Sequence, residues 1–285
     1  MISTFDIMPW QMDPGERAAL EGLLCQIRPN LSIEIGTADG GSLRSIAQYS
    51  GHVHSVDLAA PPDDINELTN VTVHTGDSHV LLPEVLAESA RDGQNVDFVL
   101  VDGDHTPDGV ERDTRDLLAS AAVNRTVIVF HDTMNDAVRA GLAHVDIEAE
   151  PKVTHYDPDF LAGRLHYRSD LHHQLWGGFG VMVLGAASRS SIRPSGVDPT
   201  AYATYDLVAP VRDALVAQER NGDLSGPSWV RHALRLSRAG DDELLHLRAE
   251  LAELQRAFDE VTTSKSWRLT APLRATARLM RNGRT

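Results

Sequence analysis

The sequence predicts an α/β fold, a doubly wound and mostly parallel sheet with helices on both faces, followed by a helical C-terminal extension. Two observations support this prediction. Short apolar segments with a period of two alternate with helical segments between residues 14 and 185. Strands separated by helices of this length need crossover connections, which favour parallel pairing with both faces of the sheet covered. We therefore expect one domain over residues 1–185.

The predicted elements follow one another in a regular order. The first helix, over residues 14–28, places Ala18, Leu20, Leu23, Leu24 and Ile27 on one face and ends at Pro29. Helices are also expected at 43–49, 80–90 and 107–122, and strands at 31–35, 52–56, 71–74, 96–101, 126–130 and 178–184, with an irregular segment at 155–176 before the last strand.

Three further segments are expected after residue 185. Residues 186–240 carry Pro, Ser and Gly and form a helical or irregular extension, with the clearest helix at 209–218. Residues 241–263 repeat apolar side chains at spacings of three and four, which predicts a short coiled-coil-like helix. This helix either packs on its own domain or pairs with a second copy, and we expect a homodimer. Residues 264–285 form a basic amphipathic tail.

Charge and composition exclude several classes of protein. The formal net charge is −15, and the tail holds six basic and no acidic residues, so residues 1–263 carry −21. Such a body repels nucleic acid, whereas the tail favours a peripheral contact with a membrane or an acidic partner. Cys25 is the single cysteine, and neither a signal peptide nor an apolar membrane span is evident. A cytoplasmic protein is expected.

A glycine-rich turn follows the first predicted strand. Backbone N–H groups of such a turn approach a ligand closely at the positive end of a helix. The turn lacks the dinucleotide spacing G-x-G-x-x-G, because Ala38 follows Gly36 by two residues, and this counts against NAD. Asp57 ends the second strand 21 residues after Gly36, which is the interval expected for a carboxylate that binds a ribose. After the third strand, Gly76, Asp77 and Ser78 are placed to flank an adenine; each piece alone is also compatible with a structural turn or a surface charge.

These residues resemble the E-x-G-x-x-x-G motif of class I, Rossmann-like methyltransferases, which Glu34, Gly36 and Gly40 match. The resemblance covers residues 14–185 and implies S-adenosylmethionine as cofactor. It implies that the turn, including Thr37, Ala38 and Ser42, lies under the methionine moiety. It also implies that Asp57 binds the ribose and that Asp77 and Ser78 flank the adenine.

Polar residues follow the fourth and fifth strands. Because the carboxyl ends of neighbouring parallel strands meet in one crevice, they are expected to face one another. They are Asp102, Asp104, His105, His131 and Asp132. Several carboxylates in one cleft repel unless a cation lies between them, and oxygen ligands favour Mg²⁺ or Mn²⁺. The alternative is that Asp102 or Asp132 caps the helix that follows.

The segments VDGDHTPDGVERD and VIVFHDT resemble a subgroup of class I enzymes that includes macrolide-sugar and carbohydrate O-methyltransferases and cephalosporin-hydroxylase-like proteins. That resemblance implies that Asp102 and Asp132 bind the metal and that His105 is the general base. His131 stands where the relatives have the first acid of a pair, and we include it among the predicted ligands, although an imidazole favours a softer ion than Mg²⁺.

The predicted function is O-methylation of a sugar, a polysaccharide precursor or a glycosylated natural product. The segment 155–177 is expected to form the substrate lid, since aromatic and polar side chains suit sugars, although such residues are as often ordinary surface. The alternatives are a small-molecule hydroxylase or other oxidoreductase on the same fold, and a non-catalytic scaffold in a biosynthetic complex. Candidate substrate residues are Asp104, His155, Tyr156, Arg164, His166, Tyr167 and Trp176.

Overall fold

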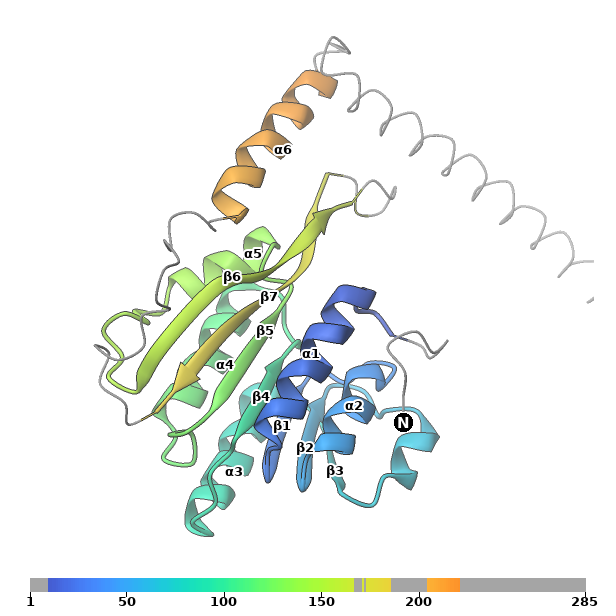
Figure 1. Ribbon diagram of the computed structural model, residues 1–285, viewed down its shortest axis with the longest axis vertical. Helices are drawn as coiled ribbons and strands as arrows, with labels where there is room; N and C mark the ends of the chain where they lie inside the picture. Colours follow the sequence, from blue (N-terminus) through green and yellow to red (C-terminus); the bar gives the residue numbers. More distant parts are fainter. Residues whose placement is uncertain (1–9, 167–170, 172, 186–203, 221–285) are drawn as a thin grey trace, which may run out of the picture. The chain divides into compact units, whose positions relative to one another are not determined.

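The computed structural model describes residues 10–166, 171, 173–185 and 204–220 (Figure 1). It contains a seven-stranded sheet in the order β3-β2-β1-β4-β5-β7-β6. Strands β1 to β5 pair in parallel, whereas β7 runs antiparallel to both of its neighbours. The strands are β1 Leu31–Ile35, β2 His52–Asp57, β3 Val71–Thr75, β4 Phe98–Val101, β5 Val127–His131, β6 Val153–Leu165 and β7 Leu175–Leu184.

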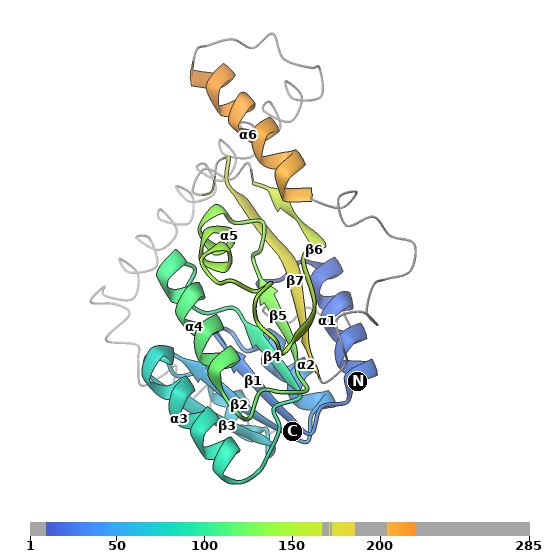
Figure 2. The ribbon, with the colours of Figure 1, turned by 90° about the vertical axis from the view of Figure 1, so that its left-hand side faces the viewer.

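Helices cover both faces of the sheet, as Figures 1 and 2 show. They are α1 Pro14–Ile27, α2 Gly41–Tyr49, α3 Ser78–Arg91, α4 Pro107–Ala119, α5 Asp136–Ala143 and α6 Thr204–Arg220, with a 3₁₀ turn, η1, at Asp63–Glu67. Contacts within the chain divide it into two units, and residues 1–166 and 173–217 form the first. The description that follows concerns this unit.

The alternation of side chains along β4 shows how one sheet serves two cores. Phe98 and Leu100 pack into the cluster that includes Leu20 and Leu24 of α1. Val99 and Val101 point to the other face and join the cluster that includes residues of α3, α4 and α5. Because both faces are buried, β4 is apolar throughout, as expected for a parallel strand between two helical layers.

The reversed strand β7 brings a third chain segment to the functional edge of the sheet. His131, the last residue of β5, pairs with Phe179 of β7. The first residues of β7 therefore lie at the carboxyl ends of β4 and β5. Loops from β1, β4 and β5 and the start of β7 converge at this edge.

The structure confirms the predicted α/β class and each predicted strand, but it corrects the segment 155–176. Much of this segment is regular, because Val153–Leu165 forms the edge strand β6 and β7 begins at Leu175. Pro158 and Gly163 interrupt the pattern, and two register shifts interrupt the pairing with β7. An exposed edge strand has no need for alternating apolar residues, so its sequence gave no strand signal. The helices expected after Asp102 and Asp132 are α4 and α5, and their N-caps are Thr106 and Asn135 instead of these two carboxylates.

Of the helices and segments predicted after residue 185, the helix at 209–218 is the one that the described residues include. α6 covers and extends the predicted helix at 209–218. It packs Ala209 against Met134 and Leu175, and its Arg212 pairs with Asp136 at 2.7 Å. The predicted coiled-coil helix at 241–263 and the basic tail at 264–285 lie outside the described residues. None of the helices in the described part is long and apolar enough to cross a membrane.

Candidate active site

The glycine-rich turn after β1 passes directly over the end of β4. Gly36 has φ +89°, and a Cβ atom there would lie 2.1 Å from the carbonyl oxygen of Asp102. Gly40, with φ +74°, precedes α2, and its Cβ would lie 2.5 Å from Ile65. Residues with side chains rarely adopt such φ values, so both positions favour glycine, and Gly36 requires it because its neighbours are backbone atoms. The turn is thus held close to the predicted catalytic residues.

Asp57 lies at the end of β2 and binds the same turn. Its Oδ2 accepts hydrogen bonds from the backbone N–H groups of Thr37 and Ala38, at 2.6 and 2.9 Å, and its Oδ1 accepts one from Ala59 at 2.8 Å. Burial alone would raise the pKa of Asp57, but these three donors lower it. A carboxylate offers about four acceptor positions, so one remains for a ribose hydroxyl.

Glu34 lies beneath the turn rather than in the crevice. Its side chain is fully buried, and its Oε1 accepts a hydrogen bond from Ser42 at 2.6 Å, while Oε2 has no hydrogen-bond partner. Burial, and secondly the nearby charge of Asp102, raises the pKa of Glu34 to about 8 in spite of the Ser42 hydrogen bond. The structure therefore places both predicted cofactor residues, Glu34 and Ser42, where they support the turn from below.

The predicted adenine-flanking residues begin α3. Gly76 has φ +153°, and Asp77 is the N-cap, since its Oδ1 accepts from the backbone N–H of His79 at 2.9 Å. Ser78 donates to the buried carboxylate of Asp113 at 3.3 Å. The structure thus gives Asp77 the capping role that its position before a helix allows.

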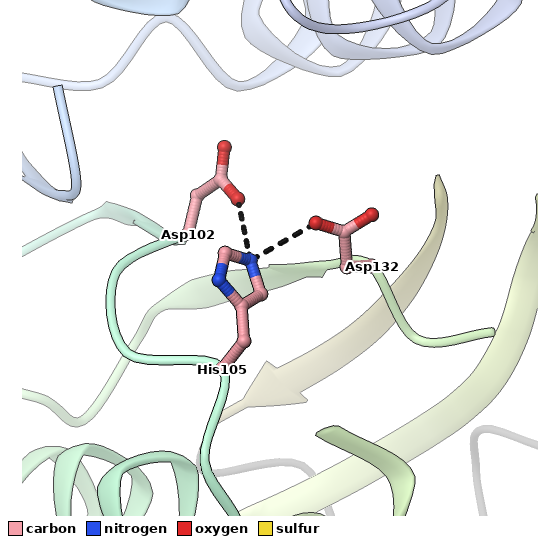
Figure 3. Close-up of side chains that lie close together, drawn as sticks. All are labelled: Asp102, His105 and Asp132. Atoms are coloured by element: carbon pink, nitrogen blue, oxygen red, sulfur yellow. Dashed lines mark ion pairs between the residues drawn. The ribbon is translucent and has the colours of Figure 1, made fainter. Parts of the chain in front are cut away.

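Asp102, His105 and Asp132 come together at the ends of β4 and β5 (Figure 3). The Nε2 atom of His105 lies 3.5 Å from Oδ1 of Asp102 and 2.9 Å from Oδ2 of Asp132. This buried nitrogen nevertheless has no well-aligned hydrogen bond. One ligand atom from each residue lies within 4.8 Å of the others, so the group could hold a metal ion.

His131 lies beside this group and is 7% exposed. Its Nδ1–H donates to Oδ1 of Asp102 at 2.8 Å, and its Nε2 lies 3.5 Å from Oε2 of Glu16 in α1. We predicted a metal-binding set of Asp102, His131 and Asp132. The donor group that the structure assembles contains His105 in place of His131, because the Nδ1 of His131 already binds Asp102.

The carboxylates and histidines of this cluster stabilise each other's charged forms. Asp102 and then Asp132 raise the pKa of His105 to about 9. Burial opposes a charge on His131, but Asp102 and Glu16 hold its pKa well above the ordinary value. Burial would likewise raise the pKa of Asp102, yet the two histidines lower it to about 2. These residues form ion pairs that are shielded from solvent.

The start of β7 is bound by two of these carboxylates. The backbone N–H of Gly177 donates to Oδ1 of Asp132 at 2.5 Å, and that of Gly178 donates to Oε1 of Glu16 at 2.6 Å. Both glycines have positive φ, and a Cβ at Gly178 would lie 2.6 Å from the carbonyl oxygen of Leu161. The turn places Trp176 edge-on to His105, with ring centroids 5.5 Å apart.

The remaining candidate substrate residues are divided between two ends of the sheet. Arg164 and His166 lie near Trp176, where Arg164 pairs with Asp13 at 2.7 Å and the backbone N–H of His166 donates to Gln174. His155 and Tyr156 pair with Val183 and Met182, which register with the first residues of β5. They therefore lie at the opposite end from His131, and the expectation that they line the site is corrected. Tyr167 lies outside the described residues.

One predicted site residue has a local structural role, and two parts of the observed site were not predicted. Asp104 is exposed, and its Oδ1 accepts from the backbone N–H of Thr106 at the start of α4. Glu16 and the Gly177–Gly178 turn were not predicted. The sequence signal at Glu16 is a capping box with Asp13, whose backbone N–H donates to Oε2 of Glu16 at 2.6 Å. Nothing in that signal points to an active site.

A family profile described as "Methyltransferase domain" matches residues 33–133. Among solved structures, an O-methyltransferase from Bacillus cereus in complex with SAH is 19% identical with a TM-score of 0.43, and the match covers 62% of this chain and 84% of that one. The O-methyltransferase TomG from Streptomyces achromogenes, involved in tomaymycin synthesis and solved with SAM, is 19% identical with a TM-score of 0.44, covering 61% and 82%. No curated protein matches the chain.

The sheet, with its glycine-rich first turn and polar strand ends, has a Rossmann-like α/β fold. The profile match runs from within β1 to just past the end of β5, so it includes the glycine-rich turn and the acidic cluster. Residues 33–133 are therefore similar to a methyltransferase domain.

Proposed function

We propose that this protein is an S-adenosylmethionine-dependent O-methyltransferase, assisted by a divalent cation, that acts on a hydroxyl of a saccharide-type substrate. One observation carries the proposal. Within the region that is similar to a methyltransferase domain, the Gly36 turn lies against the backbone of Asp102, so a cofactor on the turn adjoins the cluster of Asp102, His105 and Asp132. This is the adjacency that methyl transfer from a bound cofactor requires.

The residues of the turn fit a sulfonium nucleoside. Gly36 lets the turn lie against the backbone of Asp102, and Asp57 has one acceptor position left for a ribose hydroxyl. When bound, S-adenosylmethionine supplies the methyl group from its sulfonium. The protein's part is to align that group with the acceptor oxygen and to remove one proton.

The acidic cluster fits a hard divalent cation. Asp102 and Asp132 each direct one oxygen toward the Nε2 of His105, and that buried nitrogen has no aligned hydrogen bond. A cation on these carboxylates would lower the pKa of an acceptor hydroxyl. Mg²⁺ and Mn²⁺ prefer such oxygen ligands.

His105 is the proposed proton acceptor, a role that requires the bound cation to offset the charges of Asp102 and Asp132, which otherwise raise the pKa of its ring. It is the partly exposed histidine of the cluster, with a 34% exposed side chain, and Asp102 and Asp132 fix its ring. If its Nε2 instead bound the cation as a third ligand, the His105→Ala substitution would weaken cation binding as well as turnover. A Mn²⁺ titration of that variant distinguishes the two roles.

A sugar is the acceptor class that the rim of the site supports. Trp176 offers an indole ring beside His105, and Arg164, 64% exposed, adds a polar group near the same end of β6 and β7. Aromatic faces with nearby hydrogen-bonding groups suit the apolar and hydroxylated faces of a saccharide.

Calorimetry and a product assay test this proposal. We expect S-adenosylmethionine to bind, and S-adenosylhomocysteine to form with at least one member of a panel of free and nucleotide-linked sugars, faster with Mg²⁺ or Mn²⁺. Absence of cofactor binding would reject the methyltransferase assignment. Metal-independent turnover would reject only the role of the cation. For variants that remove an acidic side chain from the site, the control is Asp92→Ala, because Asp92 is an exposed acid at the end of α3.

A further inference from the structure

The buried side chain of His131 connects the acidic cluster to α1. Its Nδ1–H donates to Oδ1 of Asp102 at 2.8 Å, and on the opposite side of the ring Nε2 lies 3.5 Å from Oε2 of Glu16. The ring also lies edge-on to Phe179 of β7, with centroids 5.6 Å apart. These three contacts fix the direction of the N–H that Asp102 receives.

Glu16 is itself held by two backbone donors from distant parts of the chain. Oε1 accepts from Gly178 in β7 and Oε2 accepts from Asp13 at the start of α1, both at 2.6 Å. With 4% of the residue exposed, the carboxylate has little freedom to turn away. Its position relative to His131 is therefore set by the packing of α1 against β7.

We propose that His131 and Glu16 form a positioning pair for Asp102, in which His131 orients the Asp102 carboxylate toward the cation and Glu16 orients His131. The inference rests on the proposed cation site and assigns His131 to the support of that site instead of to its ligands. The support of a ligating carboxylate by a buried hydrogen-bond donor typically accounts for 10- to 100-fold in metal affinity.

The contacts favour this role over direct ligation. The Nδ1 of His131 cannot bind a cation while it donates to Asp102, and Nε2 faces Glu16 in the α1 layer. His105 Nε2 lies 3.5 Å from Asp102 and 2.9 Å from Asp132, and His105, unlike His131, belongs with them to the group whose donor atoms lie within 4.8 Å of one another. His105 thus lies between the two carboxylates that would bind the cation, whereas His131 contacts Asp102 and Glu16.

Two substitutions of His131 separate the role of its N–H from the role of its bulk. The side-chain N–H₂ of asparagine occupies nearly the same place as Nδ1–H, so His131→Asn keeps the donor to Asp102. His131→Phe fills the space and removes the donor. Mn²⁺ affinity of the full chain, measured from the electron paramagnetic resonance signal of free Mn²⁺, is the readout.

We expect His131→Asn to bind Mn²⁺ within about threefold of the wild type, and His131→Phe and Glu16→Gln to bind about 10- to 100-fold more weakly. Ala18→Gly is the matched control in α1, because this exposed substitution destabilises the helix by about 1 kcal/mol without touching the site. Its Mn²⁺ affinity should equal that of the wild type.

The outcomes distinguish this inference from the proposed function. Wild-type affinity in His131→Phe would overturn the inference and leave the cation site in place. Equal weakening in His131→Asn and His131→Phe would also overturn it, because the ring itself would then be a ligand. A wild-type chain that binds S-adenosylmethionine but no Mn²⁺ would overturn both the inference and the proposed cation site.

Discussion

Replacing Gly36 by alanine should destabilise the fold and the cofactor turn together. The added Cβ would lie 2.1 Å from the carbonyl oxygen and 2.5 Å from the carbonyl carbon of Asp102, and 2.9 Å from the backbone nitrogen of Gly103. These are backbone atoms, so no side chain can rotate away. Hydrogen bonds of 2.8 Å, from Gly36 to Val56 and from Asp102 to Ile35, hold both segments in the sheet.

The magnitude follows from two costs. A non-glycine residue at φ +89° costs about 1–2 kcal/mol. Forcing the turn and the end of β4 apart is comparable to overpacking a core, which costs about 1–3 kcal/mol. The sum, roughly 2–5 kcal/mol, is a large part of the about 5–15 kcal/mol by which domains are stable.

Urea unfolding followed by tryptophan fluorescence measures this loss. The control is Gly22→Ala in α1, where a Cβ meets nothing within 4 Å and should stabilise the helix by about 0.5–1 kcal/mol. An unfolding free energy for Gly36→Ala within 1 kcal/mol of the wild type would show that the turn does not lie against Asp102 as described.

Three further predictions concern binding, turnover and pH. Asp57→Ala should weaken S-adenosylmethionine binding by about 10- to 100-fold in calorimetry, since charged hydrogen bonds contribute about 1.5–3 kcal/mol; unchanged affinity would mean that Asp57 serves only the turn. His105→Ala should leave that affinity within about twofold while lowering kcat by about 10²- to 10⁴-fold in a product assay, and the reverse pattern would show that its role is misassigned. Burial is the main cause that raises the pKa of Asp113 to about 6, so the folded chain holds this proton to a higher pH than the unfolded chain. The stability contributed by the protonated group is therefore lost as pH rises from about 4 to 6, by up to roughly 3 kcal/mol; Asp113→Asn should gain stability relative to the wild type over that window in urea unfolding, and a pH-independent difference would contradict the assignment.

The parallel core of the sheet could be predicted because its strands are short, apolar and separated by helices. The polar residues at their ends could be predicted for the same reason, since parallel strands bring Gly36, Asp102 and Asp132 to one edge whatever the details of packing. The cluster in Figure 3 is a consequence of strand order, which the sequence pattern encodes well.

The contributions of β6, β7 and α1 could not be predicted in the same way. The edge strand β6 carries little apolar alternation, and without its register His155 could not be placed at the far end of the sheet. Glu16 meets Gly178 across 162 residues of sequence, through a contact that depends on β7 being reversed. Local patterns do not specify contacts of this range.

The two oxygens of the Asp132 carboxylate contact different groups, and this affects how substitutions in the site should be interpreted. One oxygen faces His105, while the other holds the backbone N–H of Gly177, the residue after Trp176. A replacement of Asp132 would remove the hydrogen bond to Gly177 as well as a proposed cation ligand, so a lost activity would combine both effects. The hydrogen bond and ion pairs given for the Asp102 side chain in the described part of the chain are with the two histidines, so its isosteric Asn variant is the cleaner probe of the proposed cation site.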